Sequence, residues 1–154
     1  MNARVEAPES AFALGQVPPW DTELERNILG LAMLGRPMPT WLEPEMFYPS
    51  QHQRVYEAVQ SVGGHVAKVN AWLRDSATKF APPIAWAHEL AAMCLEAEQA
   101  DQMGWACDFE QLRELANQRA LLETMARVAI RLRHGDLSHR EARRVLSDHF
   151  GEHK

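Results

Sequence analysis

The sequence predicts an all-α protein, a small helical bundle accompanied by a long α-hairpin. No stretch alternates apolar and polar residues as a half-buried strand does, and β-branched residues never cluster. Apolar residues instead recur at three- and four-residue steps, between capping patterns, glycines and prolines that mark helix ends. The chain has 154 residues, of which 46% are hydrophobic, and this is enough to bury one core.

The first predicted helix follows an N-terminal arm, residues 1–17, which we expect to be flexible. The helical domain is predicted to span residues 18–134. Its first helix should begin at Thr22 as N-cap, and Glu25 stands three residues later, where it completes a capping box. The apolar positions of this helix form one stripe, made of Leu24, Ile28, Leu31 and Ala32.

Two shorter helices are predicted in the middle of the chain. Large apolar residues at positions 41–47 lie in a segment interrupted by prolines, and we expect them to pack beneath the neighbouring helices. Ser50 should cap the next helix, with Gln53 at the capping-box position and Gly63-Gly64 at the end. A shorter helix is expected at about Val66 to Leu73.

The second half of the chain predicts two long adjacent helices, at about 83–98 and 101–134, which would form an α-hairpin of residues 83–133. Prolines are favourable in the first turn of the first helix, and Gly135 stands where a C-terminal cap of the second belongs. Ser138 and Glu141 form another capping box, which predicts a last helix over residues 138–150.

The charge of −5 is unevenly distributed. Residues 1–112 hold 7 basic and 15 acidic side chains, whereas residues 113–144 hold 8 basic and 4 acidic ones. The arginines of residues 127–144 lack interleaved aromatic residues and a recognition-helix motif, which argues against sequence-specific DNA binding. Weak contact with phosphates is one interpretation of this segment, and an ordinary solvated helix face is the other.

The sequence carries no catalytic pattern. It contains neither a phosphate-binding loop nor GxGxxG, and it offers no HExxH metal motif. The acidic pairs Glu23/Glu25 and Glu96/Glu98 are two residues apart, so each pair points to different sides of a helix. We therefore expect no catalytic residue, no cofactor and no metal, and hence no enzyme.

The same sequence indicates a cytoplasmic protein. The N-terminal residues lack the apolar run of a secretory signal, and no apolar stretch is long enough to span a membrane. Two cysteines, Cys94 and Cys107, cannot build a disulfide framework and are expected to be reduced thiols, each on an apolar helical face.

Five tryptophans in separate segments suggest a surface that binds a partner, since tryptophan is enriched where interfaces are strongest. Trp105 with Phe109 is the preferred anchor of such an interface, which would make the protein a homodimer or higher oligomer. Packing within the core is the alternative for each tryptophan. The complete set of candidate interface residues is Trp86, Trp105, Phe109, Leu112, Leu122 and Met125.

Two sequence blocks and a weaker third carry a family resemblance. Residues 17–34, VPPWDTELERNILGLAML, show two prolines, an acid-bearing helix, Leu29-Gly30 and Met33-Leu34. Residues 42–59 and the segment QRALLETM at 118–125 follow in order, and the former contains Phe47, Tyr48, His52, Val55 and Tyr56. In these blocks the chain resembles the N-terminal collar domain of DnaB-type replicative DNA helicases, over residues 17–133.

The chain departs from that family in three places. The segment GGHVAKVNAWL lacks the proline and acid that usually follow the second helix, and Pro82-Pro83 stand where glycines are usual. The family's motor domain, with its phosphate-binding loop, is missing from this sequence.

The resemblance implies a non-catalytic DNA-replication protein that binds a replicative helicase, a primase or both, as a regulator, a loader, or a phage or mobile-element inhibitor. It further implies that residues 83–133 form the pairing hairpin. Residues 138–150 would resemble the linker helix to the motor, with candidate contacts at Arg140, Arg143, Arg144 and Leu146. Two alternatives remain open: the collar of a helicase whose motor lies on a separate or removed segment, and a dimeric DNA-binding module.

Overall fold

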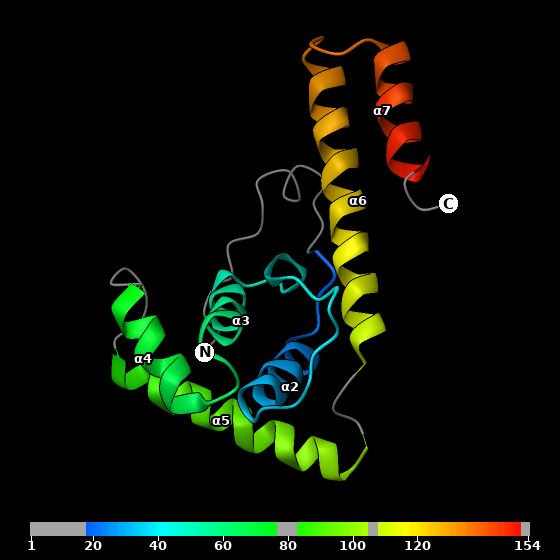
Figure 1. Cartoon of the computed structure of the whole chain (residues 1–154). Helices are drawn as coiled ribbons and strands as arrows, with labels where there is room; N and C mark the ends of the chain where they lie inside the picture. Colours follow the sequence, from blue (N-terminus) through cyan, green and yellow to red (C-terminus); the bar gives the residue numbers. More distant parts are fainter. Residues whose placement is uncertain (1–17, 77–82, 105–107, 152–154) are drawn as a thin grey trace. The chain divides into compact units, whose positions relative to one another are not determined.

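The computed structural model describes residues 18–76, 83–104 and 108–151, and within these ranges the chain is helical without any strand, as the sequence predicts (Figure 1). The expected N-terminal arm, Trp105 and Cys107 lie outside the described residues. The elements are α2 (Thr22–Met33), the 3-10 turn η1 (Pro44–Met46), α3 (Ser50–Val62), α4 (Val66–Ser76), α5 (Pro83–Gln102), α6 (Phe109–Arg133) and α7 (His139–Gly151).

The chain divides into two compact units, and each is described by itself. The first, here called the core unit, is Trp20–Ala116 and contains α2 to α5 with the start of α6. The second, here called the hairpin unit, comprises Asn117–Lys154 and Met1–Pro19. Its helices are the part of α6 from Asn117 onward and the whole of α7.

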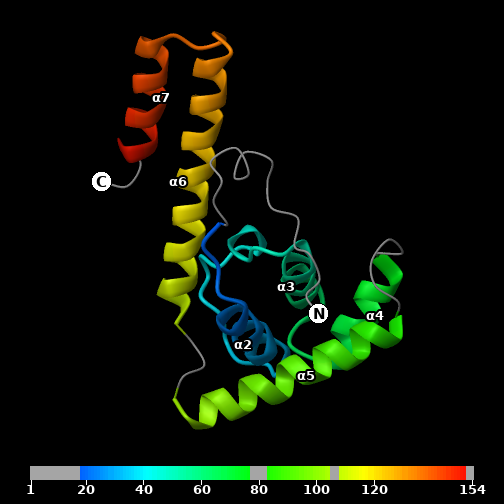
Figure 2. The same cartoon turned by 180° about the vertical axis from the view of Figure 1, so that it is seen from behind.

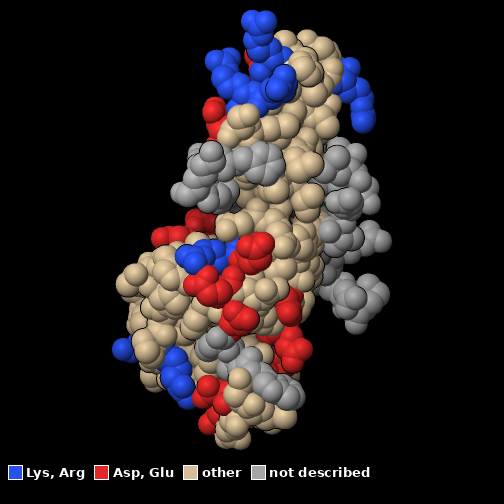
Figure 3. Space-filling view, turned by 90° about the vertical axis from the view of Figure 1, so that its right-hand side faces the viewer, with Lys and Arg blue, Asp and Glu red and all other residues tan. Residues whose placement is uncertain are grey.

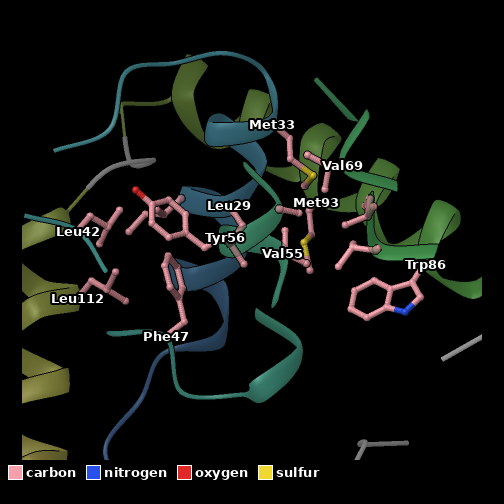
Figure 4. Packing of buried hydrophobic residues seen from close by; sticks show 14 of the residues in the cluster. Leu29, Met33, Leu42, Phe47, Val55, Tyr56, Val69, Trp86, Met93 and Leu112 are labelled. Atoms are coloured by element: carbon pink, nitrogen blue, oxygen red, sulfur yellow. The ribbon is translucent and has the colours of Figure 1, made fainter. Parts of the chain in front are cut away.

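Helix α2 is the central element of the core unit, because it packs against both α5 and α3. Phe47, from the segment before α3, is fully buried, and its ring lies 5.3 Å from that of Tyr56. Leu42 is also buried, which confirms that the large apolar residues of positions 41–47 pack beneath the helices. Figure 4 shows these side chains together with Leu29, Met33, Val55, Val69, Trp86, Met93 and Leu112.

The predicted start of α2 is wrong by one residue. Asp21, not Thr22, is the N-cap, and its carboxylate accepts a hydrogen bond of 3.0 Å from the backbone N–H of Leu24. Aspartate is among the strongest N-cap residues, and its side chain already satisfies the free N–H group. Glu25 completes no capping box, because its carboxylate is turned inward to other partners.

Helix α3 also begins differently from the prediction. Pro49 is its N-cap and makes no side-chain hydrogen bond, so Ser50 is the first helical residue. Gln53 donates a side-chain hydrogen bond of 2.8 Å to the carbonyl oxygen of Phe47, and in this way it fixes the segment that precedes the helix. Gly63 ends α3 with φ at +86°, in agreement with the prediction.

Helices α2 and α5 approach closely at Gly30. A Cβ atom at this position would lie 2.3 Å from the carbonyl oxygen of Met93 and 2.5 Å from the Cβ of Ala97. Glycine is therefore the residue that allows the two helices to cross at this distance, and the Leu29-Gly30 pair has a packing role.

The boundaries of the two long helices differ from the prediction. Helix α5 continues to Gln102, and Gly104 follows with φ at +81°. Helix α6 begins only at Phe109, preceded by Asp108, whose carboxylate accepts a hydrogen bond of 2.9 Å from the N–H of Gln111. Apolar residues recur at helical spacing from 101 onward, and this periodicity predicted one continuous helix. Periodicity does not take account of the backbone conformation of Gly104, whose φ is positive.

The hairpin unit contains a helical hairpin made by α6 and α7, which lie side by side in both views of the molecule (Figures 1 and 2). Gly135 has φ at +75°, and the N–H of Asp136 donates to the carbonyl of Arg131, as in a Schellman motif. Ser138 and Glu141 form the predicted capping box, with hydrogen bonds of 3.1 and 3.2 Å. The apolar contacts between the helices come from Val128, Leu137, Ala142 and Leu146.

The two long helices of the predicted hairpin, residues 83–133, belong mostly to different units. Helix α5 is a core helix that packs on α2 and α4, whereas α6 is the first arm of a hairpin whose second arm is α7. The sequence pattern located both long helices, and their pairing as one hairpin stays a prediction.

Candidate functional site

The candidate interface residues have different environments in the structure. Trp86 is 5% exposed and Leu112 is fully buried, both within the core of the core unit. These two side chains are already covered by the protein's own fold, so their assignment to a partner interface is wrong. Phe109 is half-buried against the same core, and Trp105 lies outside the described residues.

The other two candidates lie on the part of α6 that belongs to the hairpin unit. Leu122 is half-buried, whereas Met125 is 44% exposed. Met125 is therefore the one member of the described candidates that offers a largely exposed apolar side chain to a partner.

The tryptophans of the described residues are all used for packing. Trp86 lies in the core, and the ring of Trp20 stacks at a tilt 5.4 Å from that of Tyr48. The guanidinium of Arg113 lies 4.3 Å from the centre of the Trp41 ring, and that of Arg54 lies 4.8 Å from the Trp72 ring. Cation–π contacts of this kind contribute about 0.5–1 kcal/mol each where they are exposed. Each of the four tryptophans of the described residues thus has a contact within the chain.

A cluster of arginines covers the end of the hairpin unit where α6 turns into α7 (Figure 3). All of its members are exposed, and within the described part of the chain none of them forms an ion pair. We call this cluster the basic end, which consists of Arg127, Arg131, Arg133, Arg140, Arg143 and Arg144.

The basic end also exposes apolar side chains. Leu132 is 42% exposed and Val145 is 38% exposed, and each is a sequence neighbour of an arginine of the cluster. Leu146, a predicted linker-helix contact, packs within the hairpin unit against Val128 of α6, Leu137 of the turn and Ala142 of α7. Its side chain holds the hairpin together, while the arginines of α7 face the solvent.

Helix α5 carries a surface of the opposite charge in the core unit. One side of the helix is buried, through Trp86, Leu90, Met93 and Ala97. On the exposed side, Glu89 and Glu96 lie along one edge and Glu98 lies along the other, as their helical spacing requires, and Leu95, which is 60% exposed, lies between the two edges. We call this surface the acidic face of α5, and it consists of Glu89, Ala91, Leu95, Glu96 and Glu98.

Arg26 of α2 contacts two of these carboxylates. It donates to both oxygens of Glu96, over 2.8 and 3.1 Å, and it forms an ion pair with Glu89. The hydrogen bond to Glu96 raises the pKa of the Arg26 guanidinium above its ordinary value, against the opposing effect of burial. One arginine faces two carboxylates here, so the acidic face keeps a net negative charge.

A buried carboxylate joins α2 to α3, and the sequence analysis missed it. The Glu25 side chain is fully buried, and its oxygens accept hydrogen bonds of 3.1 and 3.2 Å from the backbone N–H of Tyr48. Nδ1 of His52, itself buried, lies 2.9 Å from the Glu25 carboxylate and donates to it. This arrangement holds the two helices and the segment between them.

The described residues contain no group of three or more His, Cys, Asp or Glu that could hold a metal ion. In the same ranges, every helix is too short or too polar to cross a membrane. The chemistry that the surface does offer is charge, with arginines on one unit and carboxylates on the other.

Cys94 is half-buried on α5, and burial, together with the charge of Glu98, raises the pKa of its thiol. The thiolate is the reactive form, so a raised pKa leaves less of it at any given pH. In a Cys107→Ser variant, we expect iodoacetamide to alkylate Cys94 more slowly at pH 8 than it alkylates a cysteine peptide. The pH midpoint of the rate should lie above that of the peptide, and it should fall in a further Glu98→Gln variant. A midpoint at or below the peptide value would contradict this assignment.

No protein-family model, curated protein or solved structure matches this chain.

Proposed function

We propose that this chain is a non-catalytic DNA-replication protein that binds a replicative helicase, its primase or both, and that it works in the cytoplasm. The observation that carries the proposal is the α6–α7 hairpin with its exposed basic end. In the helicase collar domains that the sequence resembles, a pairing hairpin, expected here at residues 83–133, is followed by a linker helix, and α7 stands at the position expected for that linker helix.

The residues that carry the resemblance support the same proposal through their positions. Gly30 lies at the contact of α2 with α5, and Tyr48 and His52 bind the buried carboxylate of Glu25. These motif residues have structural roles in this fold. Residues that build a fold are those expected to persist between proteins that share it, even where their functions differ.

The protein would act by placing its own helical surface where a helicase protomer otherwise places one. The α6–α7 hairpin, whose second helix stands where the linker helix of the family is expected, would occupy surfaces that a helicase protomer otherwise uses. Arg140, Arg143 and Arg144 are exposed and unpaired among the described residues, so they are free to contact acidic groups of that partner. The outcome would be either assisted loading or blocked assembly.

Light scattering after size exclusion, on the protein alone and mixed with its cognate helicase and primase, tests this function. We expect a stable complex with the helicase, with a changed hexamer mass. The variant Arg140→Glu/Arg143→Glu/Arg144→Glu should weaken the complex at least about tenfold, because charge reversal at an interface introduces repulsion. The exposed pair Lys68→Glu/Arg74→Glu on α4 provides the matched control and should bind normally. The helicase ATPase rate in the complex then distinguishes an activator from an inhibitor.

The possible results separate the proposal from its first alternative. A dimer that ignores the helicase but retains primase would indicate the collar domain of a helicase whose motor is a separate segment. A protein that binds neither would overturn the proposal.

The basic end gives one reason to keep DNA binding as a second candidate function. A module that uses these arginines should show an affinity for DNA that falls steeply with salt concentration, because each phosphate contact releases counterions. DNA binding that survives charge reversal at Arg140, Arg143 and Arg144 would exclude this role for the basic end.

A further inference from the structure

We propose that the basic end of one copy docks on the acidic face of α5 in a second copy, so that the protein associates with itself head to tail. This inference rests on surfaces of the chain itself and is independent of any helicase. It differs from a symmetric pairing of two hairpins, because the two docking surfaces are different.

The basic end keeps a net positive charge, and none of its arginines forms an ion pair with a described residue. Between residues 127 and 144 there are six arginines and two carboxylates, Asp136 and Glu141. Glu141 is engaged in the capping box with Ser138. Six like charges on one turn and two adjacent helices repel each other, so an acidic surface brought against them relieves that repulsion.

The acidic face of α5 offers the complementary groups. Glu98 forms no ion pair with any described residue, and Arg26 neutralises only one charge of the Glu89 and Glu96 pair. Their side chains are 47% and 50% exposed, so both remain accessible beside Arg26. The surface therefore keeps carboxylates that arginines of a second copy can bind.

Both surfaces also expose apolar side chains. Leu95 is 60% exposed between Glu96 and Glu98, with the small side chain of Ala91 one turn away. On the basic end, Leu132 and Val145 are 42% and 38% exposed. Burying such side chains against each other contributes roughly 25 cal/mol for each Å² removed from water. Protein interfaces usually combine apolar side chains with charged ones in this way.

This composition favours a second copy over a nucleic acid. Surfaces that hold single strands combine basic groups with aromatic side chains on which bases stack, and among the described residues 127–145 the only aromatic rings are the imidazoles of His134 and His139, with no Trp, Tyr or Phe. Phosphates would leave Leu132 and Val145 exposed, whereas the acidic face of α5 covers them.

A contact between two different surfaces leaves a free basic end on one copy and a free acidic face on the other. Further copies can then add, and the average mass should rise with protein concentration. Since the exposed charges are screened by salt, the mass should fall towards that of the monomer between about 50 mM and 500 mM NaCl.

Two charge-reversal variants and their mixture provide the test. The end variant is Arg140→Glu/Arg143→Glu/Arg144→Glu. The face variant is Glu89→Lys/Glu98→Lys, which retains the two hydrogen bonds between Arg26 and Glu96. In each variant both surfaces have the same sign, so each alone should be monomeric by light scattering at 50 mM NaCl. Their circular dichroism should match that of the unchanged protein.

The mixture of the two variants is decisive. The acidic end of one fits the basic face of the other, so the mixture should recover a complex of twice the monomer mass that 500 mM NaCl dissociates. The Lys68→Glu/Arg74→Glu variant should associate as the unchanged protein does. A protein that is monomeric at low salt overturns the proposal, even if it binds an oligonucleotide through the basic end. So does a dimer that neither variant disrupts, or a mixture that stays monomeric.

Discussion

Replacing Glu25 with alanine should lower the free energy of unfolding by about 3–5 kcal/mol, the largest effect expected from a single substitution in this chain. The carboxylate is fully buried and accepts hydrogen bonds from the Tyr48 N–H and from His52. Its removal leaves two buried donors without an acceptor and opens a cavity between α2 and α3. Urea unfolding followed by circular dichroism at 222 nm measures the change.

The control for this experiment is Glu23→Ala. Glu23 lies on the same helix two residues earlier and is exposed, so its replacement should alter stability by less than about 0.5 kcal/mol. A double-mutant cycle with His52→Ala should give a coupling above about 1 kcal/mol, because the two side chains share one hydrogen bond. Equal stabilities for the Glu25 and Glu23 variants would show that the buried carboxylate does not hold these elements together.

The second large effect is expected from Gly30→Ala. In the interior of an ordinary exposed helix this change stabilises a protein by up to about 1 kcal/mol, since alanine is the better helix former. Here the added Cβ would lie 2.3 Å from the carbonyl oxygen of Met93, which belongs to the backbone of α5 and cannot rotate away. Helices α2 and α5 must then separate, so we expect a loss of about 2–3 kcal/mol.

A companion variant separates the two clashes at this position. Gly30→Ala combined with Ala97→Gly removes the contact of 2.5 Å with the Ala97 Cβ but keeps the clash with the Met93 carbonyl. The double variant should therefore remain less stable than the unchanged protein. If Gly30→Ala raises the midpoint of urea unfolding, the close approach of α2 and α5 is refuted.

The local parts of the fold could be predicted from the sequence. The capping box of Ser138 and Glu141 and the glycine at 135 are determined by residues at most a few positions apart, and both are present as expected. The same local rule failed at Glu25, whose partners Tyr48 and His52 lie 23 and 27 residues further along the chain. A capping pattern cannot reveal that a carboxylate has a stronger partner in tertiary structure.

The surface could be predicted only in part, because the sequence does not show whether an apolar side chain is covered by the chain's own fold or by a partner. Trp86 and Leu112 fit an interface as well as they fit a core, and the fold places both in the core. The arginines of α7 are different, since groups that stay charged are rarely buried without a partner. Their exposure could be predicted from their charge. To predict the acidic face of α5, one must also know which side of that helix is buried.

The turn between α6 and α7 has a consequence for any partner of the basic end. Gly135 closes one helix with backbone hydrogen bonds, and Ser138 with Glu141 opens the next, so the reversal is held by its own residues. The backbones that carry Arg131, Arg133 and Arg140 are therefore already ordered before binding. A partner needs to immobilise only side chains, and the entropy lost on association is correspondingly small.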